Sequence, residues 1–286
     1  MSYYNFDRAL SYNALLNFIL TTRGLGKTYG AKKLVINRFL KKKEKFIYLR
    51  RYKDELSTIE TFFDDISKDE QFKNVEFKIR GKDFYINNEH CGKAMILSIS
   101  QRYKSSPFPD YTTIIFDEFI INTTNIRYLK NEPWHFLEFF STVARKRNNV
   151  RAILLANNIS LINPYFQYFN CIPKSGNRFT LAKDGEILVD ICKDEEFNEE
   201  MYKTKFGKLI KGTTYGNYAI ENESLLDNNE FINKKRANDS CFMFSILHNN
   251  IELGFWISYN DEKIHVSKDI QKLSFTILKL KKCVMK

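Results

Sequence analysis

Residues 15–35 of this 286-residue chain, from Leu15 to Val35, read LLNFILTTRGLGKTYGAKKLV. An apolar strand, a turn with two glycines and a helix follow one another in this stretch. A phosphate-binding loop needs these three parts, because the backbone N–H groups of the turn and the positive end of the helix converge on the phosphates. The segment therefore predicts a nucleoside triphosphate site.

The turn matches the motif G-x-x-x-x-G-K-[ST] except at its first position, where Thr21 replaces glycine. We expect this departure to alter only how the chain leaves the strand. Lys27 would reach the β- and γ-phosphates, and the Thr28 hydroxyl would bind Mg²⁺. The residues expected to wrap the nucleotide are Arg23, Gly24, Leu25, Gly26, Lys27 and Thr28. For the loop alone, a strand-to-helix turn that binds nothing is the alternative.

A second apolar strand, YTTIIFDEF over residues 111–119, ends in Asp117 and Glu118. Ligands of parallel sheets bind beyond the carboxyl ends of the strands, so these carboxylates should emerge beside the loop. Asp117 is expected to hold Mg²⁺ and Glu118 to orient the water that attacks the γ-phosphate. A solvated turn after a strand is the alternative reading, and the upstream Lys27 disfavours it.

The segment NEPWHFLEFFSTVARKR, residues 131–147, predicts an amphipathic helix that starts near Pro133 and ends in basic residues. Cations at a helix carboxyl terminus are favoured by the macrodipole without any further role. The functional alternative is an arginine finger that reaches a neighbouring subunit's nucleotide. Arg145 is the first candidate for this finger and Arg147 the reserve.

The next strand, residues 150–156, is followed by Asn157. An amide at this carboxyl end could hydrogen-bond the attacking water or the γ-phosphate. Asn is also common in ordinary turns. The sequence favours the first role slightly.

Several motifs, spaced in one order along most of the chain, resemble the DNA-packaging motor ATPase of small short-tailed bacteriophages, the type whose motor carries a structural packaging RNA. This family is related to the large terminase subunit. The motifs are TRGLGK at 22–27, YLRRYKDEL at 48–56, IFDEF at 115–119, TVAR at 142–145, NPYF at 163–166 and FGKLIKGT at 206–213.

The resemblance implies a homo-oligomeric ring, docked at the portal of a procapsid, that hydrolyses ATP with Mg²⁺ and threads double-stranded DNA inward. The resemblance also implies a packaging RNA as a partner, and the sequence does not decide whether this motor needs one. By position, Arg145 matches the family's trans-acting finger and Lys104 a second trans-acting cation. Lys53 lies where the family presents a lysine to DNA. Without the resemblance, both lysines would be taken as solvated surface charges.

Strands alternate with helices through the first two-thirds of the chain, which predicts an α/β fold with a mostly parallel sheet and helices on both faces. We expect a P-loop NTPase of the additional-strand, catalytic-Glu type over residues 1–195. A helix is expected around Glu55 to Ile66, and a hairpin over residues 75–86. Residues 196–229 are read as a linker region. Residues 230–286 are read as a small β-rich domain, for which the resemblance points to a reduced RNase H-like fold without nuclease activity.

The net charge of +11 and the isoelectric point near 9.2 favour a polyanionic partner. Lys41, Lys42 and Lys43 form one basic cluster and are the second candidate for DNA contact after Lys53, although such a cluster can be merely a solvated face. Five cysteines without C-x-x-C pairing predict neither a disulfide framework nor a zinc site. With no signal peptide or membrane span visible, we expect a protein of the host cytoplasm that docks transiently on the procapsid.

Two other function classes remain open on the sequence. A helicase-like ATPase stimulated by nucleic acid would keep Lys27, Asp117 and Glu118 but act on unpaired strands. A non-enzymatic structural protein that binds nucleic acid would make the loop vestigial.

Overall fold

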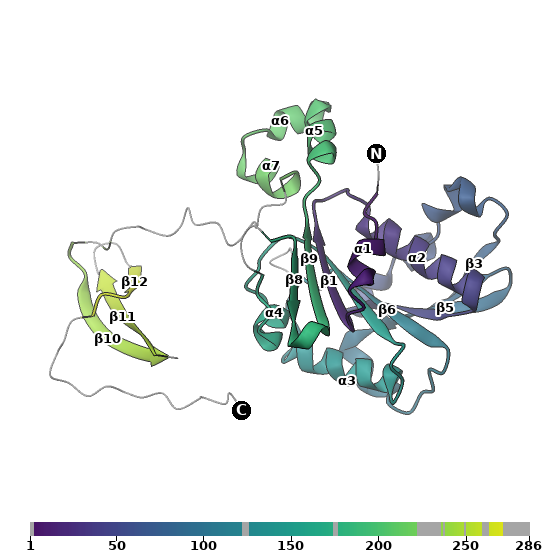
Figure 1. Cartoon of the computed structure of the whole chain (residues 1–286), viewed down its shortest axis with the longest axis horizontal. Helices are drawn as coiled ribbons and strands as arrows, with labels where there is room; N and C mark the ends of the chain where they lie inside the picture. Colours follow the sequence, from purple (N-terminus) through teal and green to yellow (C-terminus); the bar gives the residue numbers. More distant parts are fainter. Residues whose placement is uncertain are drawn as a thin grey trace. The chain divides into compact units, whose positions relative to one another are not determined.

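The computed structural model describes residues 3–121, 126–173, 177–221, 236, 238–248, 250–258 and 263–270. It divides the chain into two compact units, Met1–Asp227 and Asn228–Lys286, which are described separately (Figure 1). The described part of the predicted linker consists of three short helices, α5 (Glu195–Lys203), α6 (Lys205–Ile210) and α7 (Thr214–Ala219). The domain bounds inferred from the sequence stay a prediction.

The first unit is built on a sheet that, over the described residues, has nine strands in the order β3-β4-β5-β2-β6-β7-β1-β9-β8. The six strands from β5 to β9 in this order are parallel, and β3, β4 and β8 add antiparallel edges. The bounds are β1 Leu16–Thr21, β2 Lys45–Arg50, β3 Phe77–Arg80, β4 Asp83–Ile86, β5 Glu89–Ile96, β6 Tyr111–Asp117, β7 Arg151–Asn157, β8 Phe179–Ala182 and β9 Ile187–Cys192.

Strand β7 lies between β1, which leads into the glycine turn, and β6, which ends in Asp117. This is the additional strand that the sequence predicted, so the α/β P-loop fold with a mostly parallel sheet is confirmed. The central strands are buried along their whole length, as expected for a sheet covered on both sides.

Helices cover both faces of the sheet (Figure 1). One hydrophobic cluster joins the sheet to α2 (Lys27–Lys42) and the N-terminal segment with α1 (Asp7–Ser11). The other joins it to α3 (Glu132–Ala144) and α4 (Pro164–Phe169). Pro133 occupies the first turn of α3 as predicted. The 3₁₀ turn η5 (Leu97–Tyr103) packs on α3, and η6 (Lys183–Gly185) joins β8 to β9.

The hairpin predicted over residues 75–86 is confirmed as β3 and β4. The prediction of a helix around Glu55 to Ile66 is wrong. The chain instead forms four short 3₁₀ turns, η1 Lys53–Leu56, η2 Ile59–Thr61, η3 Ile66–Lys68 and η4 Glu70–Phe72. Short polar side chains compete here with a continuous helix, since Asp65 accepts from the backbone N–H of Ile66 and Thr61 donates to the Thr58 carbonyl.

The described part of the second unit is an antiparallel sheet of β10 (Cys241–His248), β11 (Ile251–Ser258) and β12 (Lys263–Ser267). Strands β10 and β11 form a hairpin, and β12 pairs with β11 on its other side. Phe242 packs edge-on against Trp256, with ring centroids 5.0 Å apart. The relation to an RNase H-like fold stays a prediction.

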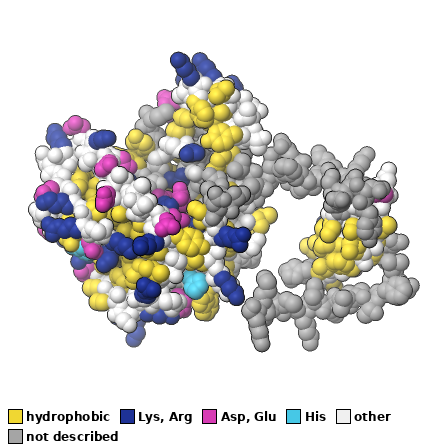
Figure 2. Space-filling model, turned by 180° about the vertical axis from the view of Figure 1, so that it is seen from behind, with side chains coloured by type: hydrophobic (Ala, Val, Ile, Leu, Met, Phe, Trp, Pro, Cys, Tyr) yellow, Lys and Arg dark blue, Asp and Glu magenta, His cyan; other side chains and the backbone are white. Residues whose placement is uncertain are grey.

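Lys and Arg side chains are spread over the visible face of the large unit and alternate with Asp and Glu (Figure 2). The positive net charge therefore does not by itself locate a nucleic-acid surface on this face.

In the described part of the chain, no helix is both long and apolar enough to cross a bilayer.

Phe18, at the centre of β1, provides a test of this core. Its side chain is fully buried and lies against the rings of Phe119 and Phe166, at centroid distances of 5.2 and 5.5 Å. We expect Phe18→Ala to lower the free energy of unfolding by about 3–5 kcal/mol, measured by urea denaturation followed by circular dichroism. Phe206→Ala, at a side chain that is 53% exposed, should change it by less than about 0.5 kcal/mol. Equal effects would contradict the packing described here.

Candidate active site

Three parallel strands bring the predicted site residues to one end of the sheet, where the carboxyl ends of the strands lie. This end is called the carboxyl edge below, and the end where the parallel strands begin is called the amino edge. Thr21, at the end of β1, pairs with Asn157 at the end of β7, and Asp117, at the end of β6, pairs with Leu155. Because these carboxyl ends lie side by side, the loop after β1 faces the carboxylates after β6.

The glycine turn has the backbone that the motif requires. Gly24 and Gly26 adopt φ values of +91° and +76°, which glycine tolerates and other residues rarely do. Thr21 remains in β1, and its hydroxyl donates to the Thr22 carbonyl at 2.8 Å. The replacement of the first glycine of the motif by Thr21 therefore only lengthens the strand. Leu25 is buried, and its carbonyl accepts from the N–H of Tyr4 at 2.9 Å. The core therefore anchors the turn.

Lys27 begins α2 and donates from Nζ to Oδ1 of Asn157 at 2.5 Å. Burial lowers the pKa of the Lys27 amine, and the carboxylates of Asp117 and Glu118 oppose this effect. A partly buried cation held by a neutral amide is electrostatically available to an incoming phosphate.

Thr28 and Asp117 form a pair of oxygen donors suited to Mg²⁺. The Thr28 hydroxyl lies 3.2 Å from Oδ2 of Asp117, and the hydroxyl of Tyr48 donates to the same oxygen at 3.1 Å. Burial, followed by the Asp117 charge, raises the pKa of Tyr48, so this hydroxyl stays protonated and orients the carboxylate. Magnesium prefers such hard oxygen ligands, and it keeps several waters. The donor set therefore fits the ion that the sequence predicts.

Glu118 follows Asp117 in a left-handed conformation, with φ +59°, and its side chain is 67% exposed. Its carboxylate accepts from Nη2 of Arg50 at 2.6 Å. Arg50, at the end of β2, also donates from Nε to Glu55 at 3.2 Å. Arg50 thus holds the side chain of the predicted catalytic glutamate.

Arg51, the next residue, is fully buried and pairs with Glu132. Its guanidinium also donates to the backbone carbonyls of Glu118 and Phe119. Sequence reasoning did not assign Arg50, Arg51 or Glu132 to the site. A signal was present, because two arginines directly after a predicted parallel strand must reach the same edge as the other strand ends.

Helix α7 approaches the glycine turn. Nη1 of Arg23 lies 3.4 Å from the hydroxyl of Tyr215, and both residues are exposed. Arg23 is therefore held loosely beside the loop, where it can turn toward a phosphate.

Arg145 lies at the opposite edge of the sheet. It follows the last residue of α3 and donates from Nη2 to the Ser106 carbonyl at 3.2 Å, just before β6 begins. The six residues of β6 that precede Asp117 span about 20 Å at the usual rise of a strand. The chain does not bring Arg145 to its own nucleotide site.

Arg147 donates to the carbonyls of Phe108, Pro109 and Val143 at 2.6–2.7 Å, so its guanidinium is occupied within the fold. This favours Arg145 over Arg147 as a group that could reach another subunit. Lys104 forms an ion pair with Glu138 of α3 at 3.0 Å and is half exposed.

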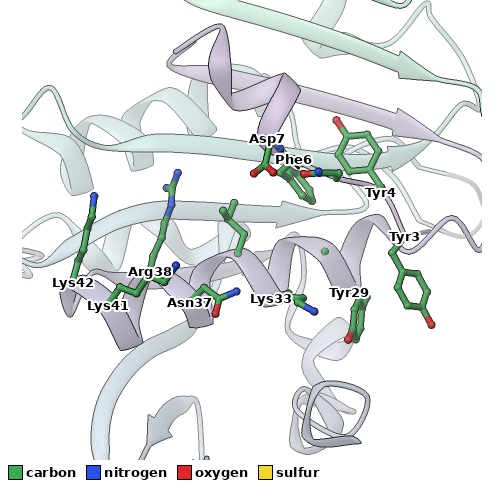
Figure 3. Close-up of a pocket in the computed structure, with 13 residues that line it drawn as sticks. Tyr3, Tyr4, Phe6, Asp7, Tyr29, Lys33, Asn37, Arg38, Lys41 and Lys42 are labelled. Carbon is green, nitrogen blue, oxygen red and sulfur yellow. Dashed lines mark hydrogen bonds between the residues drawn. The ribbon is translucent and has the colours of Figure 1, made fainter. Parts of the chain in front are cut away.

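The two lysine groups predicted to contact DNA lie at opposite edges. Lys53 is exposed in η1, directly after β2, at the same edge as the nucleotide loop. Lys41 and Lys42 end α2 at the other edge, where they line a groove of about 540 Å³ between α2 and the N-terminal segment (Figure 3). Lys43 pairs with Glu89 at the start of β5. The structure does not bring Lys53 and this cluster together.

A metal-dependent nuclease needs converging carboxylates, and two acidic residues of the C-terminal region, Asp239 and Glu252, lie within the described residues. Asp239 accepts from Ser258 at 3.0 Å, and Glu252 accepts from Ser245 at 2.6 Å. Asp227, Glu230, Asp261 and Glu262 lie outside the described residues.

The strand order, the glycine turn and the paired carboxylates define a P-loop NTPase fold. The family of Podovirus DNA encapsidation proteins (Gp16) matches residues 1–285. The chain belongs to this family.

Individual relatives agree with this assignment. The chain is 44% identical over 260 residues to a DNA packaging protein of Bacillus phage B103, covering 91% of this chain and 79% of that protein. It is 41% identical over 264 residues to that of Bacillus phage phi29, covering 92% and 78%.

Two solved structures extend the similarity to three dimensions. The N-terminal domain of the DNA packaging ATPase from bacteriophage phi29 matches with a TM-score of 0.63 and 40% identity, over 68% of this chain and 98% of that one. A chain of the phi29 viral genome packaging motor assembly matches with a TM-score of 0.71 and 38% identity, over 100% and 86%. The chain is therefore a homologue of the phi29 packaging ATPase.

Thr28 provides a test of the magnesium site. We expect Thr28→Ala to weaken Mg²⁺-dependent binding of a non-hydrolysable ATP analogue by about tenfold, equivalent to roughly 1.4 kcal/mol, because the hydroxyl is removed from the pair with Asp117. Thr28→Ser keeps the hydroxyl and should bind like the parent. Calorimetric titration with and without Mg²⁺ measures the difference. Equal loss in both variants would contradict a ligand role for the hydroxyl.

Proposed function

We propose that this protein is an ATP-hydrolysing motor subunit that moves double-stranded viral DNA into a procapsid as part of a homo-oligomeric ring. The observation that carries the proposal is the meeting of Lys27, Thr28, Asp117 and Glu118 at one sheet edge, in a chain that belongs to a DNA-encapsidation family. The ring would dock on the portal in the host cytoplasm, with a packaging RNA as a further partner of the motor.

The nucleotide half of the site comes from one subunit. Arg23, Gly24, Leu25 and Gly26 would wrap the phosphates, and Lys27 would bind the β- and γ-phosphates. Thr28 and Asp117 would hold Mg²⁺, which neutralises phosphate charge when bound. Glu118 would accept a proton from the attacking water, while Asn157 would contact the γ-phosphate after Lys27 turns away from it.

The second half would come from a neighbouring subunit. Arg145 lies at the opposite edge of the sheet from its own Asp117, and its side chain is exposed and donates to the backbone carbonyl of Ser106. Such a group is free to meet the developing charge in another subunit's site, with Lys104 as a second cation. Hydrolysis then depends on assembly, so the isolated subunit should be a poor ATPase.

DNA would be held through its phosphates, because a motor must move any sequence and base contacts would impose stops. Lys53 is the leading contact, because it lies where the family presents a lysine to DNA and its side chain is exposed. Lys41, Lys42 and Lys43 could meet only a different stretch of nucleic acid at the other edge. We propose no nuclease activity, because neither Asp239 nor Glu252 belongs to a group of three or more metal-ligating side chains among the described residues.

Lys27→Ala tests whether the loop drives the motor. In ATP-driven DNA uptake into empty procapsids, we expect uptake to fall to background, because the phosphates lose the cation of the loop. Lys33→Ala, on the same helix but paired at the surface with Asp69, should retain uptake. Unchanged uptake by Lys27→Ala would support a structural role instead, and unwinding of duplex DNA by the parent would support a helicase.

A mixing experiment tests the shared site. Subunits with Arg145→Ala and subunits with Glu118→Gln should each be inactive in ATP turnover, and a mixture should regain it, because intact Glu118 then meets intact Arg145 across an interface. Turnover of the parent should also fall on dilution below the assembly concentration. Full turnover at high dilution, or a mixture without rescue, would refute the shared site.

Lys53→Ala should weaken DNA stimulation of turnover and reduce the slope of log affinity against log salt by about one, because one phosphate contact is lost. Lys73→Ala removes an equal charge from an exposed pair with Glu70 and should leave both unchanged. Fluorescence anisotropy with duplex DNA at several salt concentrations measures the slope. Identical slopes in the two variants would exclude Lys53 from the DNA contact.

A further inference from the structure

Arg51 and Glu132 form a buried ion pair beneath the catalytic loop, and both side chains are almost fully removed from solvent. The carboxylate of Glu132 accepts four hydrogen bonds. Two come from Nε and Nη2 of Arg51 at 2.8 and 2.9 Å, one from the hydroxyl of Tyr165 at 2.9 Å, and one from the N–H of Leu129 at 2.8 Å. Such a fully bonded pair fixes the positions of the elements that it joins.

The other side of the same guanidinium holds the backbone at Glu118. Nη1 of Arg51 donates to the Glu118 carbonyl at 3.2 Å, and Nη2 donates to the Phe119 carbonyl at 2.8 Å. Glu118 has a left-handed backbone that residues other than glycine rarely adopt. The contacts with Arg51 therefore help to keep the catalytic residue in this conformation.

Glu132 is also the first residue of α3, and Arg145 directly follows the last. A helix of 13 residues is stiff and about 20 Å long. One continuous path therefore runs from the Glu118 backbone through Arg51 and Glu132, and along α3 to Arg145. The two ends of this path carry the two groups that would serve different nucleotide sites.

We propose that Arg51 and Glu132 are positioning residues that couple the catalytic loop of one subunit, through α3, to the placement of Arg145 in the neighbour's site. The proposal rests on the proposed function, since it requires Arg145 to act across an interface. A shift of the Glu118 loop then displaces the amino end of α3 and, with it, the finger. Neither residue would contact nucleotide.

A purely stabilising role explains the arrangement less well. A buried ion pair seldom stabilises a fold more than apolar residues of the same size would. Here the remaining donors of Arg51 are directed at the backbone carbonyls of Glu118 and of Phe119, the residue that follows it, which is where a positioning group has to act.

The test isolates finger donation in mixed rings. The recipient is Arg145→Ala, which keeps an intact nucleotide site. Three donors all carry Glu118→Gln, so that turnover can arise only in recipient sites. The first donor has no other change, the second adds Glu132→Gln, and the third adds Asp190→Asn. Asp190 is a matched control, because it is fully buried and paired with Arg178 and Tyr4, which lie beside β8 and in the N-terminal segment.

We expect the first and third donors to rescue turnover equally and the second to rescue about 100-fold less, because a small misplacement of a catalytic group has an effect of this size. In the converse mixture, the recipient subunits carry Glu132→Gln and the donor subunits carry only Glu118→Gln. There, kcat should fall while KM for ATP stays unchanged. If Glu132→Gln does not fold, as judged by circular dichroism, Arg51→Met with Glu132→Leu replaces it, since an apolar pair can preserve the fold.

The outcomes separate the two proposals. Failure of the first donor refutes the trans finger, and the coupling falls with it. Rescue by the second donor equal to that by the first overturns the coupling alone. Equal loss with the second and third donors also overturns it, because the effect would then reflect general destabilisation.

Discussion

The parallel register of β1, β7 and β6 is the constraint on which the rest of the site depends. Because Thr21 lies opposite Asn157, and Leu155 opposite Asp117, the three strands end at one level. The loop after β1 can then place Lys27 on Asn157 and Thr28 on Asp117 without further adjustment. A slip of one residue in any of these strands would turn its side chains to the other face and separate the pairs.

The edge that results is crowded with charge, and the fold balances it pair by pair. Asp117 meets Thr28 and Tyr48, Glu118 meets Arg50, and Glu132 meets Arg51. Buried charges are tolerated only with such partners. A bound triphosphate adds negative charge at Lys27 and the start of α2, so it changes this balance at a partly buried cation that is held by a neutral amide.

The sequence predicted what depends on local pattern. Strand ends fix which residues share an edge, so the meeting of Lys27, Thr28, Asp117 and Asn157 followed from the apolar runs and the glycine turn. It did not predict Arg51 with Glu132, because this pair joins residues 81 positions apart in the chain, and no rule of local spacing links an arginine after a strand to a glutamate at the start of a distant helix. The missed 3₁₀ turns after β2 have a different cause, since Asp and Thr side chains replaced helical hydrogen bonds that periodicity alone favours.

The placement of the cations also bears on how copies of the chain would associate. The nucleotide loop lies at the carboxyl edge of the sheet, and Arg145 lies at the amino edge, held by the Ser106 carbonyl. A contact that brings one edge of a subunit to the other edge of the next uses two different surfaces, and repeating it head to tail closes a ring if the rotation allows. A two-fold dimer would instead pair each surface with itself. Under the proposed function, the opposite placement of loop and finger therefore favours a ring over a symmetric dimer.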